Sequence, residues 1–437
     1  MFVKKLASLS FALALVYSIS LPARAELLKN FKTDGSIEVK TFGIDNETDR
    51  NGTADDYRSE TRSRILLGGS FDLLDDVHSR ILLRKNNHLQ GQAVESVQTV
   101  ESAVAIDNGY VKIDKVFGHV DLTIGRQFYG DSNDLLIYFG LQPDDLLSVT
   151  SLDVFRADAD IMGWAKFQGI AGKTAETTAV SATPTPPAAT NANSDTDIWG
   201  GELSTDKLIP KGNLGVGYYT LQAKGAGVIG NNTLNNVSIK ANGDVPVLSG
   251  LGYAAQYVQN FGRNNAVGGT PSHRGDAYIL GLNANHDFGK MPLRAHAEYG
   301  RGSDDFVSIA PGKRFGIIWG EHTNAAGAPS LNGSVGGAGL TNLRVFDLGA
   351  GTNCPITHVG IDLNWYRFIY DESLATVPNA GKTSAGSELD LILSHKHSEN
   401  VSLEASLARF WVGDALQNAA TPTNPVTRIG ADVKIKF

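Results

Sequence analysis

The sequence predicts an all-β protein, a transmembrane antiparallel up-and-down β-barrel of about 18 strands, with about 16 also compatible. Three observations support this prediction. The chain begins with an export signal, its apolar residues alternate with polar ones up to the last residue, and no apolar stretch after the signal is long enough for a membrane-spanning helix. A barrel crosses a membrane without such a stretch because only alternate residues of each strand face lipid.

Residues 1–25 have the features of a cleaved signal peptide. Lys4 and Lys5 precede a mostly apolar stretch over residues 6–21, and Ala23-Arg24-Ala25 has the small-x-small pattern of a cleavage site. A membrane-anchoring helix is the alternative, but the stretch is short and rich in serine, and no cluster of charges follows it. We therefore expect residues 26–437 to form a mature barrel in the outer membrane of a Gram-negative bacterium.

The last ten residues, from Arg428 to Phe437, form the clearest strand. The apolar positions are Ile429, Ala431, Val433, Ile435 and Phe437, and the residues between them are Gly430, Asp432, Lys434 and Lys436. This alternation is typical of a strand with one apolar face. An edge strand of a soluble sheet is the alternative. A final strand that ends in Phe is typical of outer-membrane barrels, so we expect the barrel assembly machinery to recognise Phe437.

The same alternation recurs at residues 120–125, 293–299, 388–393 and 401–407. Aromatic pairs such as Tyr218-Tyr219 and Trp365-Tyr366 stand where we expect an interfacial girdle. Short turns, for example at residues 115–118 and 287–292, alternate with long polar connections. We predict long extracellular loops at about residues 44–56, 171–197 and 323–340.

The composition excludes several other functions. A net charge of −8 argues against nucleic acid as a partner, and the single cysteine, Cys354, gives neither a disulfide framework nor a thiolate metal site. No nucleophile elbow or phosphate-binding loop is present, so we predict that the protein is not an enzyme. A barrel of this size keeps a water-filled bore, which favours a channel for small hydrophilic or anionic solutes. The alternative is a non-channel secreted or surface β-protein that binds glycans.

Two stretches resemble the alginate-export porin family. The first is Gly125-Arg-Gln-Phe-Tyr-Gly-Asp131 followed by Ser151-Leu-Asp-Val-Phe-Arg156, and the second is Gly386-Ser-Glu-Leu-Asp390 with Phe410-Trp-Val-Gly-Asp414. The family has Phe-Asp where this chain has Leu-Asp-Val-Phe, and its middle third has no counterpart here. The resemblance implies an 18-stranded barrel with a charged lumen, a monomer rather than a trimer. Sugar acids or an anionic polysaccharide are among the solutes that we expect for such a channel.

The polar faces of the early strands are rich in arginine, which suits bidentate binding of carboxylates. The predicted pore-lining residues are Arg58, Arg62, Arg64, Arg80, Arg84, Arg126 and Arg156, together with Asp158, Asp160, Glu388 and Asp390. Such a wall would select anions. In the alternative interpretation the arginines pair with carboxylates such as Glu60, Asp153 and Asp158 and leave a wall of mixed charge.

One acidic segment has the ligand spacing of a calcium turn. Glu47, Asp49, Asn51 and Asp55 could supply oxygen ligands in the first external loop, although the closing bidentate Glu of an EF-hand is missing. A solvated acidic loop is the simpler interpretation, and we expect no other cofactor. The remaining expected partners are outer-membrane lipids and lipopolysaccharide.

Overall fold

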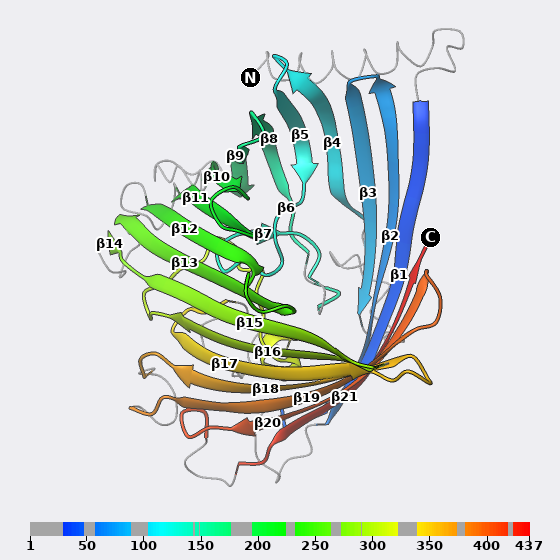
Figure 1. Ribbon diagram of the computed structural model, residues 1–437, viewed down its shortest axis with the longest axis vertical. Coiled ribbons are helices and arrows are strands. Elements are labelled where there is room, and N and C mark those ends of the chain that lie inside the picture. Colours follow the sequence, from blue (N-terminus) through cyan, green and yellow to red (C-terminus); the bar gives the residue numbers. More distant parts are fainter. Residues whose placement is uncertain are drawn as a thin grey trace, which may run out of the picture.

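The computed structural model describes residues 29–47, 57–88, 104–142, 145–147, 149–175, 195–223, 232–263, 272–289, 291–321, 339–373, 381–417 and 423–437. The predicted signal peptide, residues 1–25, lies outside these ranges. The chain forms a closed antiparallel β-barrel with almost no helix, as predicted (Figure 1). No helix among the described residues is long and apolar enough to cross a membrane.

Eighteen long strands make up the wall in the described part of the chain. They are β1 (Lys29–Asp45), β2 (Arg58–Leu74), β3 (Val77–His88), β4 (Ala105–Val116), β5 (Val120–Gln127), β8 (Leu152–Ile161), β9 (Ala165–Ala175), β10 (Thr196–Thr205), β11 (Gly212–Ala223), β12 (Asn232–Asp244), β13 (Leu251–Arg263), β15 (Asp276–Phe288), β16 (Met291–Gly302), β17 (Leu343–Asn353), β18 (Val359–Tyr370), β19 (Ser384–Lys396), β20 (Val401–Val412) and β21 (Val426–Lys436). A two-residue strand, β14 (Ser272–His273), extends the pairing of β13.

The barrel is closed by pairing β21 with β1 (Figure 1). Their register runs from Ser36 opposite Lys436 to Asp45 opposite Thr427. Beyond it the Gly35 N–H donates to the Phe437 carbonyl at 2.8 Å, and the Phe437 N–H donates back at 3.1 Å. Closure leaves no wall strand with an unpaired edge among the described residues, which is the condition for a sheet in lipid.

The period-two alternation separates the two surfaces of the wall as the sequence predicts. On β21, Ile429, Val433 and Ile435 are exposed on the outer face, whereas Arg428 is buried in the lumen. Adjacent aromatic residues divide in the same way, because neighbours on a strand point to opposite faces. Tyr218 and Trp365 face outward, and Tyr219 is buried inside, so only one member of such a pair can belong to a girdle.

The two ends of the barrel differ in the length of their connections. Short turns join strands at one end, for example at residues 117–119, 162–164 and 397–400. Met162 and Gly163 both have positive φ, 55° and 67°, as tight hairpin turns require. The other end carries the long connections, and it is called the long-loop end below.

Two of the predicted loops overlap strands at their ends. β1 continues to Asp45, inside the predicted loop 44–56, and the larger overlap is at loop 171–197. Strand β9 continues to Ala175 and β10 begins at Thr196, because Ile198 and Asp197 pair with Gly172 and Lys173. The ends of the predicted loop 171–197 are therefore strand. The centre of that loop, most of loop 323–340 and residues 48–56 of loop 44–56 lie outside the described residues.

Candidate functional site

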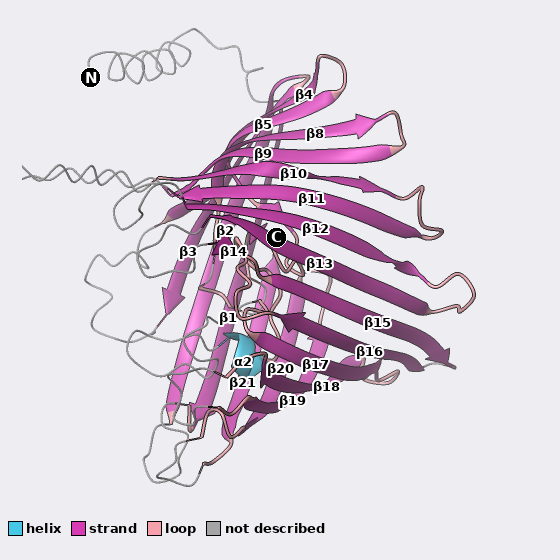
Figure 2. Ribbon diagram, turned by 90° about the vertical axis from the view of Figure 1, so that its left-hand side faces the viewer, coloured by secondary structure: helices cyan, strands magenta, loops and turns pink. Residues whose placement is uncertain are grey.

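Two connections at the long-loop end turn into the lumen instead of standing above it (Figure 2). The first includes the described residues 128–142, 145–147 and 149–151 and contains β6 (Tyr129–Gly130) and β7 (Tyr138–Phe139). The second includes the described residues 303–321 and 339–342 and contains a one-turn helix, α2 (Ile317–Glu321). We call them the first and the second inward loop.

The two inward loops are joined to each other. The Tyr138 N–H donates to the Ala310 carbonyl at 2.6 Å, and Ile137 and Ala310 form a parallel β-bridge. The Ser308 hydroxyl donates to the Leu135 carbonyl at 2.7 Å. Because each loop satisfies backbone groups of the other, they form one body across the bore.

Apolar side chains explain why these loops fold inward. Leu135, Leu136 and Ile137 form an uninterrupted apolar run in the first loop, and each is at most 1% exposed. Phe306 and Ile318 of the second loop are also fully buried in the same cluster. In a water-filled lumen these side chains would stay exposed to water. Packing the two loops together removes their apolar surface from water, which is favourable.

The first anchor of this body lies on β12 and β13. The Asp134 carboxylate forms an ion pair with Lys240 at 2.6 Å and accepts a hydrogen bond from the Gln256 amide at 2.7 Å. The Gln256 amide oxygen accepts from the Leu135 N–H at 3.0 Å. Farther along β13, the Asn260 side chain accepts from the Val307 N–H at 2.7 Å and donates to the Val307 carbonyl at 3.1 Å.

The second anchor lies on β19 and holds the beginning of α2. The Glu388 carboxylate accepts the N–H groups of Ile318 and Trp319 at 2.6 and 3.0 Å, and Asp390 accepts the Ile317 N–H at 2.9 Å. These N–H groups have no partner within the helix, so the carboxylates satisfy them. Both acids point inward as predicted, but they are at most 1% exposed beneath α2. The prediction that Glu388 and Asp390 line the water-filled path is therefore wrong.

Aromatic stacking reinforces this second anchor. The Trp319 ring lies 4.4 Å from the Phe368 ring, centroid to centroid, and nearly parallel to it. Phe410 of β20 lies 5.8 Å from the same indole. A helix of one turn has little stability alone, so these contacts and the carboxylates determine where it lies.

The third anchor lies on β2, on another side of the bore. The Arg64 guanidinium donates to the Gln142 carbonyl at 3.0 Å, and Arg62 pairs with Asp145 at 3.2 Å. Both partners belong to the first inward loop. Two of the predicted pore-lining arginines therefore hold a constriction in place.

Buried tyrosines fill the space between the first loop and β11. The hydroxyls of Tyr129 and Tyr219 are hydrogen-bonded at 2.8 Å, and their rings meet edge to face. Burial raises the pKa of Tyr129 to about 12. Its hydroxyl therefore stays protonated at any physiological pH.

All seven predicted arginines are paired with carboxylates, and the pairs on the lumen face agree with the alternative interpretation of a wall of mixed charge. The pairs are Arg58–Glu47, Arg62–Glu60, Arg64–Glu38, Arg80–Asp34, Arg84–Asp107, Arg126–Asp153 and Arg156–Asp158, at 2.6–3.1 Å. Arg58, Arg62 and Arg428 also gather round the Phe42 ring, with Arg428 closest at 4.6 Å.

Arg126 lies on the outer face of the barrel, so its prediction as a pore-lining residue is wrong. It is opposite Asp153 in the register between β5 and β8, on the same face as Ile124 and the 58% exposed Phe155. It stands one residue from the end of β5, where an outward side chain meets lipid headgroups and water rather than acyl chains.

The predicted calcium turn is described only at Glu47, whose carboxylate is 2.7 Å from Arg58. Asp49, Asn51 and Asp55 lie outside the described residues. Within the described part of the chain, no group of three or more His, Cys, Asp or Glu side chains is placed to hold a metal ion.

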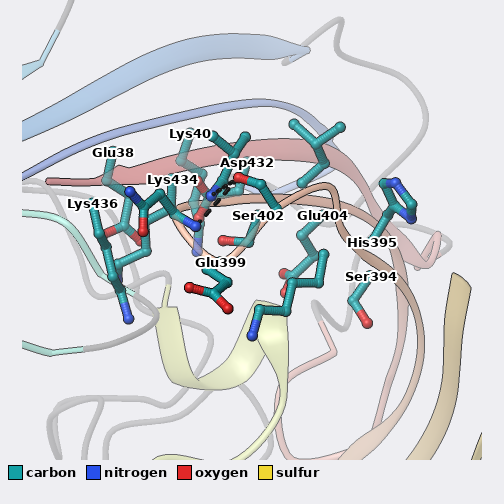
Figure 3. Close-up of a pocket in the computed structure, with 15 residues that line it drawn as sticks. Glu38, Lys40, Ser394, His395, Glu399, Ser402, Glu404, Asp432, Lys434 and Lys436 are labelled. Carbon is teal, nitrogen blue, oxygen red and sulfur yellow. Dashed lines mark hydrogen bonds and ion pairs between the residues drawn. The ribbon is translucent and has the colours of Figure 1, made fainter. Parts of the chain in front are cut away.

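Two pockets open in the lumen on the short-turn side of the inward loops. One, of about 460 Å³, places Lys40, Lys434 and Lys436 beside Glu38, Glu399, Glu404 and Asp432 (Figure 3). Lys396 also lines this pocket. The other, of about 580 Å³, is acidic. Its charged residues are Asp121, Asp158, Asp160 and Glu202, with Lys115 and Lys166. Asp158 and Asp160 thus face the lumen, and the lumen on this side of the inward loops carries both signs of charge.

The residues that anchor the constriction from β12 and β13 were not predicted. Lys240, Gln256 and Asn260 lie on the polar faces of these strands, and alternation therefore predicts that they point into the lumen. The sequence signal for a loop that folds inward is the apolar run of residues 135–137 between two strands, since such a run is costly in a solvated external loop.

The closed barrel with a polar, constricted bore places the protein among porin-like β-barrels by fold. Several solved outer-membrane proteins of Pseudomonas aeruginosa share this architecture. OprD aligns with a TM-score of 0.58 and 12% identity over 94% of each chain. OccK9 (OpdG) aligns with a TM-score of 0.59 and 12% identity over 93% of this chain and 98% of that one.

A third structure, OpdK of Pseudomonas aeruginosa with vanillate, aligns with a TM-score of 0.54 and 9% identity over 93% of this chain and 98% of that one. At these identities the likeness shows the fold alone. No family model and no curated protein sequence matches the chain. The fold of the chain is therefore similar to that of outer-membrane porins. None of the comparisons supports the resemblance to alginate-export porins in particular.

Proposed function

We propose that this protein is an outer-membrane porin, a channel through which small hydrophilic solutes diffuse. One observation carries the proposal: a closed 18-strand wall encloses a polar lumen that is narrowed by two inward loops anchored on β2, β12–β13 and β19. A bore without a constriction would pass solutes by size alone, whereas a charged constriction also discriminates by chemistry.

Small organic anions and zwitterions are the solutes that this lumen fits best. Guanidinium and ammonium groups stand next to carboxylates along the path, so a carboxylate and an amine or hydroxyl on one solute both find partners. The similar barrel OpdK was solved with vanillate, a small organic anion, which supports this class. A polysaccharide chain would have to thread past both inward loops, so sugar acids are favoured over a polymer.

The non-channel alternative, a soluble glycan-binding protein, is disfavoured by the outer surface. Leu280, Leu282, Leu348 and Leu363 are all about half exposed there. A surface of this kind is stable against lipid and is an aggregation liability in water.

The experiment that tests the channel is conductance and ion selectivity in planar bilayers. We expect single-channel steps from the purified barrel. Arg156→Gln should shift the reversal potential in a salt gradient toward cations, because Asp158 loses its partner at 2.8 Å. The double variant Arg156→Gln with Asp158→Asn should return close to the wild-type potential.

Arg126→Gln is the matched control, since it removes the same charge from the outer face of the neighbouring strand. It should leave the reversal potential unchanged. All shifts should shrink in molar salt, where the screening length is about 3 Å. Absence of conductance steps from correctly folded protein would contradict the channel, and unchanged potentials in both lumen variants would remove Arg156 and Asp158 from the path.

A further inference from the structure

Basic side chains on the outer face gather near the long-loop end of the barrel. The strand residues concerned are Lys85, Arg126, Lys173, Arg301, Arg344, Arg367 and Arg409. Near the short turns the outer face carries apolar residues instead, among them Trp164, Phe288 and Met291. This asymmetry matches a membrane with an anionic leaflet on the long-loop side.

Arg301 and Arg344 form the densest part of this basic belt. They are directly opposite each other on β16 and β17, a pairing of like charges that destabilises a sheet unless an anion lies between them. Asp371 supplies that anion, and Asp276 places a second carboxylate 3.5 Å from Arg301. The Asp371 carboxylate takes two hydrogen bonds from Arg301, both at 2.9 Å, and one from the Arg344 Nε at 2.6 Å.

The exposed fractions of these three side chains show which of them face outward. The Asp371 side chain is 5% exposed, whereas those of Arg301 and Arg344 are 31% and 40% exposed. Burial opposes ionisation of Asp371, but the hydrogen bonds from Arg301 and Arg344 outweigh it and hold the pKa of this carboxyl below its ordinary value. The acid therefore stays ionised and fixes two guanidinium groups side by side above it.

The backbone around Asp371 is itself fixed. Its N–H donates to the Asn342 carbonyl at 3.2 Å, and the Asn342 side chain accepts from the Glu372 N–H at 2.7 Å and donates to the Glu372 carbonyl at 3.0 Å. The arginine pair is thus preorganised, which lowers the entropy lost when an anion binds.

An apolar groove of about 520 Å³ lies on the outer face directly below the arginine pair. Its side chains include Leu280, Leu282, Ala297, Tyr299, Phe346, Leu348 and Trp365. The Tyr299 and Phe346 rings lie 4.6 Å apart, two residues along β16 and β17 from Arg301 and Arg344. An amphipathic ring at this level marks the boundary between headgroups and acyl chains.

We propose that this outer-face site binds a phosphorylated lipid of the leaflet on the long-loop side, with a phosphate on Arg301 and Arg344 and an acyl chain in the groove. In a Gram-negative outer membrane that lipid is lipopolysaccharide, whose lipid A part carries phosphates directly above its acyl chains. Both Nη groups of Arg344 remain available as donors, because Asp371 occupies only its Nε. Charge complementarity favours this occupant over a second copy of the chain.

The inference rests on the proposed placement in an outer membrane, and it is tested without using conductance. Purified barrel in detergent is titrated with bisphosphorylated lipid A and with the dephosphorylated form, and bound lipid is counted by native mass spectrometry. We expect tight binding of the phosphorylated lipid alone. Arg344→Gln should weaken it about tenfold, the loss expected for one charge-assisted hydrogen bond.

Asp371→Asn should act in the opposite direction. It removes a negative charge beside the bound phosphate and frees Arg344, and this gain should exceed the loss of preorganisation and tighten binding. The control is Arg294→Gln, which removes an arginine from the lumen face of β16, the strand that carries Arg301 on its outer face; Arg294 pairs with Asp362. It should not change lipid binding. Equal affinity for both lipid forms, unchanged affinity in Arg344→Gln, or a stable dimer with a covered groove would each overturn the proposal. If the protein bound no phosphorylated lipid but conducted ions normally, the lipid site would be overturned and the proposed channel function would stand.

Discussion

At the scale of single residues, the side of the wall decides what a substitution costs. Leu363 and Asn364 are neighbours in the middle of β18, one 47% exposed on the outer face and the other in the lumen. Leu363→Arg should lower the free energy of unfolding by about 2–4 kcal/mol, because the charge is placed near the middle of the bilayer. Asn364→Arg introduces the same side chain and should be tolerated.

Urea titration of both variants from lipid vesicles measures this difference. Similar unfolding free energies for the two variants would contradict the assignment of inner and outer faces.

Arg126 shows how far alternation alone can be trusted at this scale. Val120, Leu122 and Ile124 lie on its face of β5, so strict alternation places Arg126 outside, as the structure does. The prediction grouped it with the other arginines on the polar faces of the early strands, which implies that a charged side chain avoids the lipid-facing surface. That expectation holds at the middle of a strand and fails at its end, where side chains reach the headgroups.

At the scale of elements, α2 depends on two carboxylates of the wall. Glu388→Ala removes the acceptors of the Ile318 and Trp319 N–H groups, and each hydrogen bond to a charged group contributes about 1.5–3 kcal/mol. The second inward loop should then detach from β19 while the strands stay paired. Single-channel recordings should show larger and noisier conductance with normal barrel assembly.

Ser387→Ala is the control for this variant, because Ser387 is the neighbour of Glu388 on the outward-facing side of β19. It should behave as the wild type. A conductance that is equally unchanged in Glu388→Ala would show that the second inward loop does not narrow the path.

The strands could be predicted from the sequence, and the inward loops could not, for one physical reason. A strand in a barrel is encoded locally by its own alternation, and the apolar-against-polar pattern of residues 428–437 needs no partner to be recognised. The position of α2 depends on Glu388 and Asp390, which lie about 70 residues away in the chain. A contact between residues so far apart leaves no periodic pattern in the sequence. Alternation therefore placed both acids correctly on the inner face, but it did not reveal that α2 covers them and excludes water.

At the scale of the whole molecule, the seam between β1 and β21 controls assembly. Deleting Phe437 removes both hydrogen bonds to Gly35 at one end of the seam, and Phe437→Ala keeps them but removes the ring. If the assembly machinery recognises the ring, both variants should reduce the folded fraction in membranes, measured by heat-modifiable migration on gels. If only the closing of the barrel between β1 and β21 matters, the deletion alone should reduce the folded fraction. Normal folded levels of both variants would contradict a role for the terminal residue.

The inward loops have a mechanical consequence as well. A thin-walled tube of many strands flattens easily when the surrounding lipid presses unevenly on it. Here one rigid body is fastened to β2, to β12 and β13, and to β19, which lie well apart around the circumference. It therefore acts as an internal brace between these strands, so we expect that a change that widens the path for solutes also weakens the wall against lateral pressure.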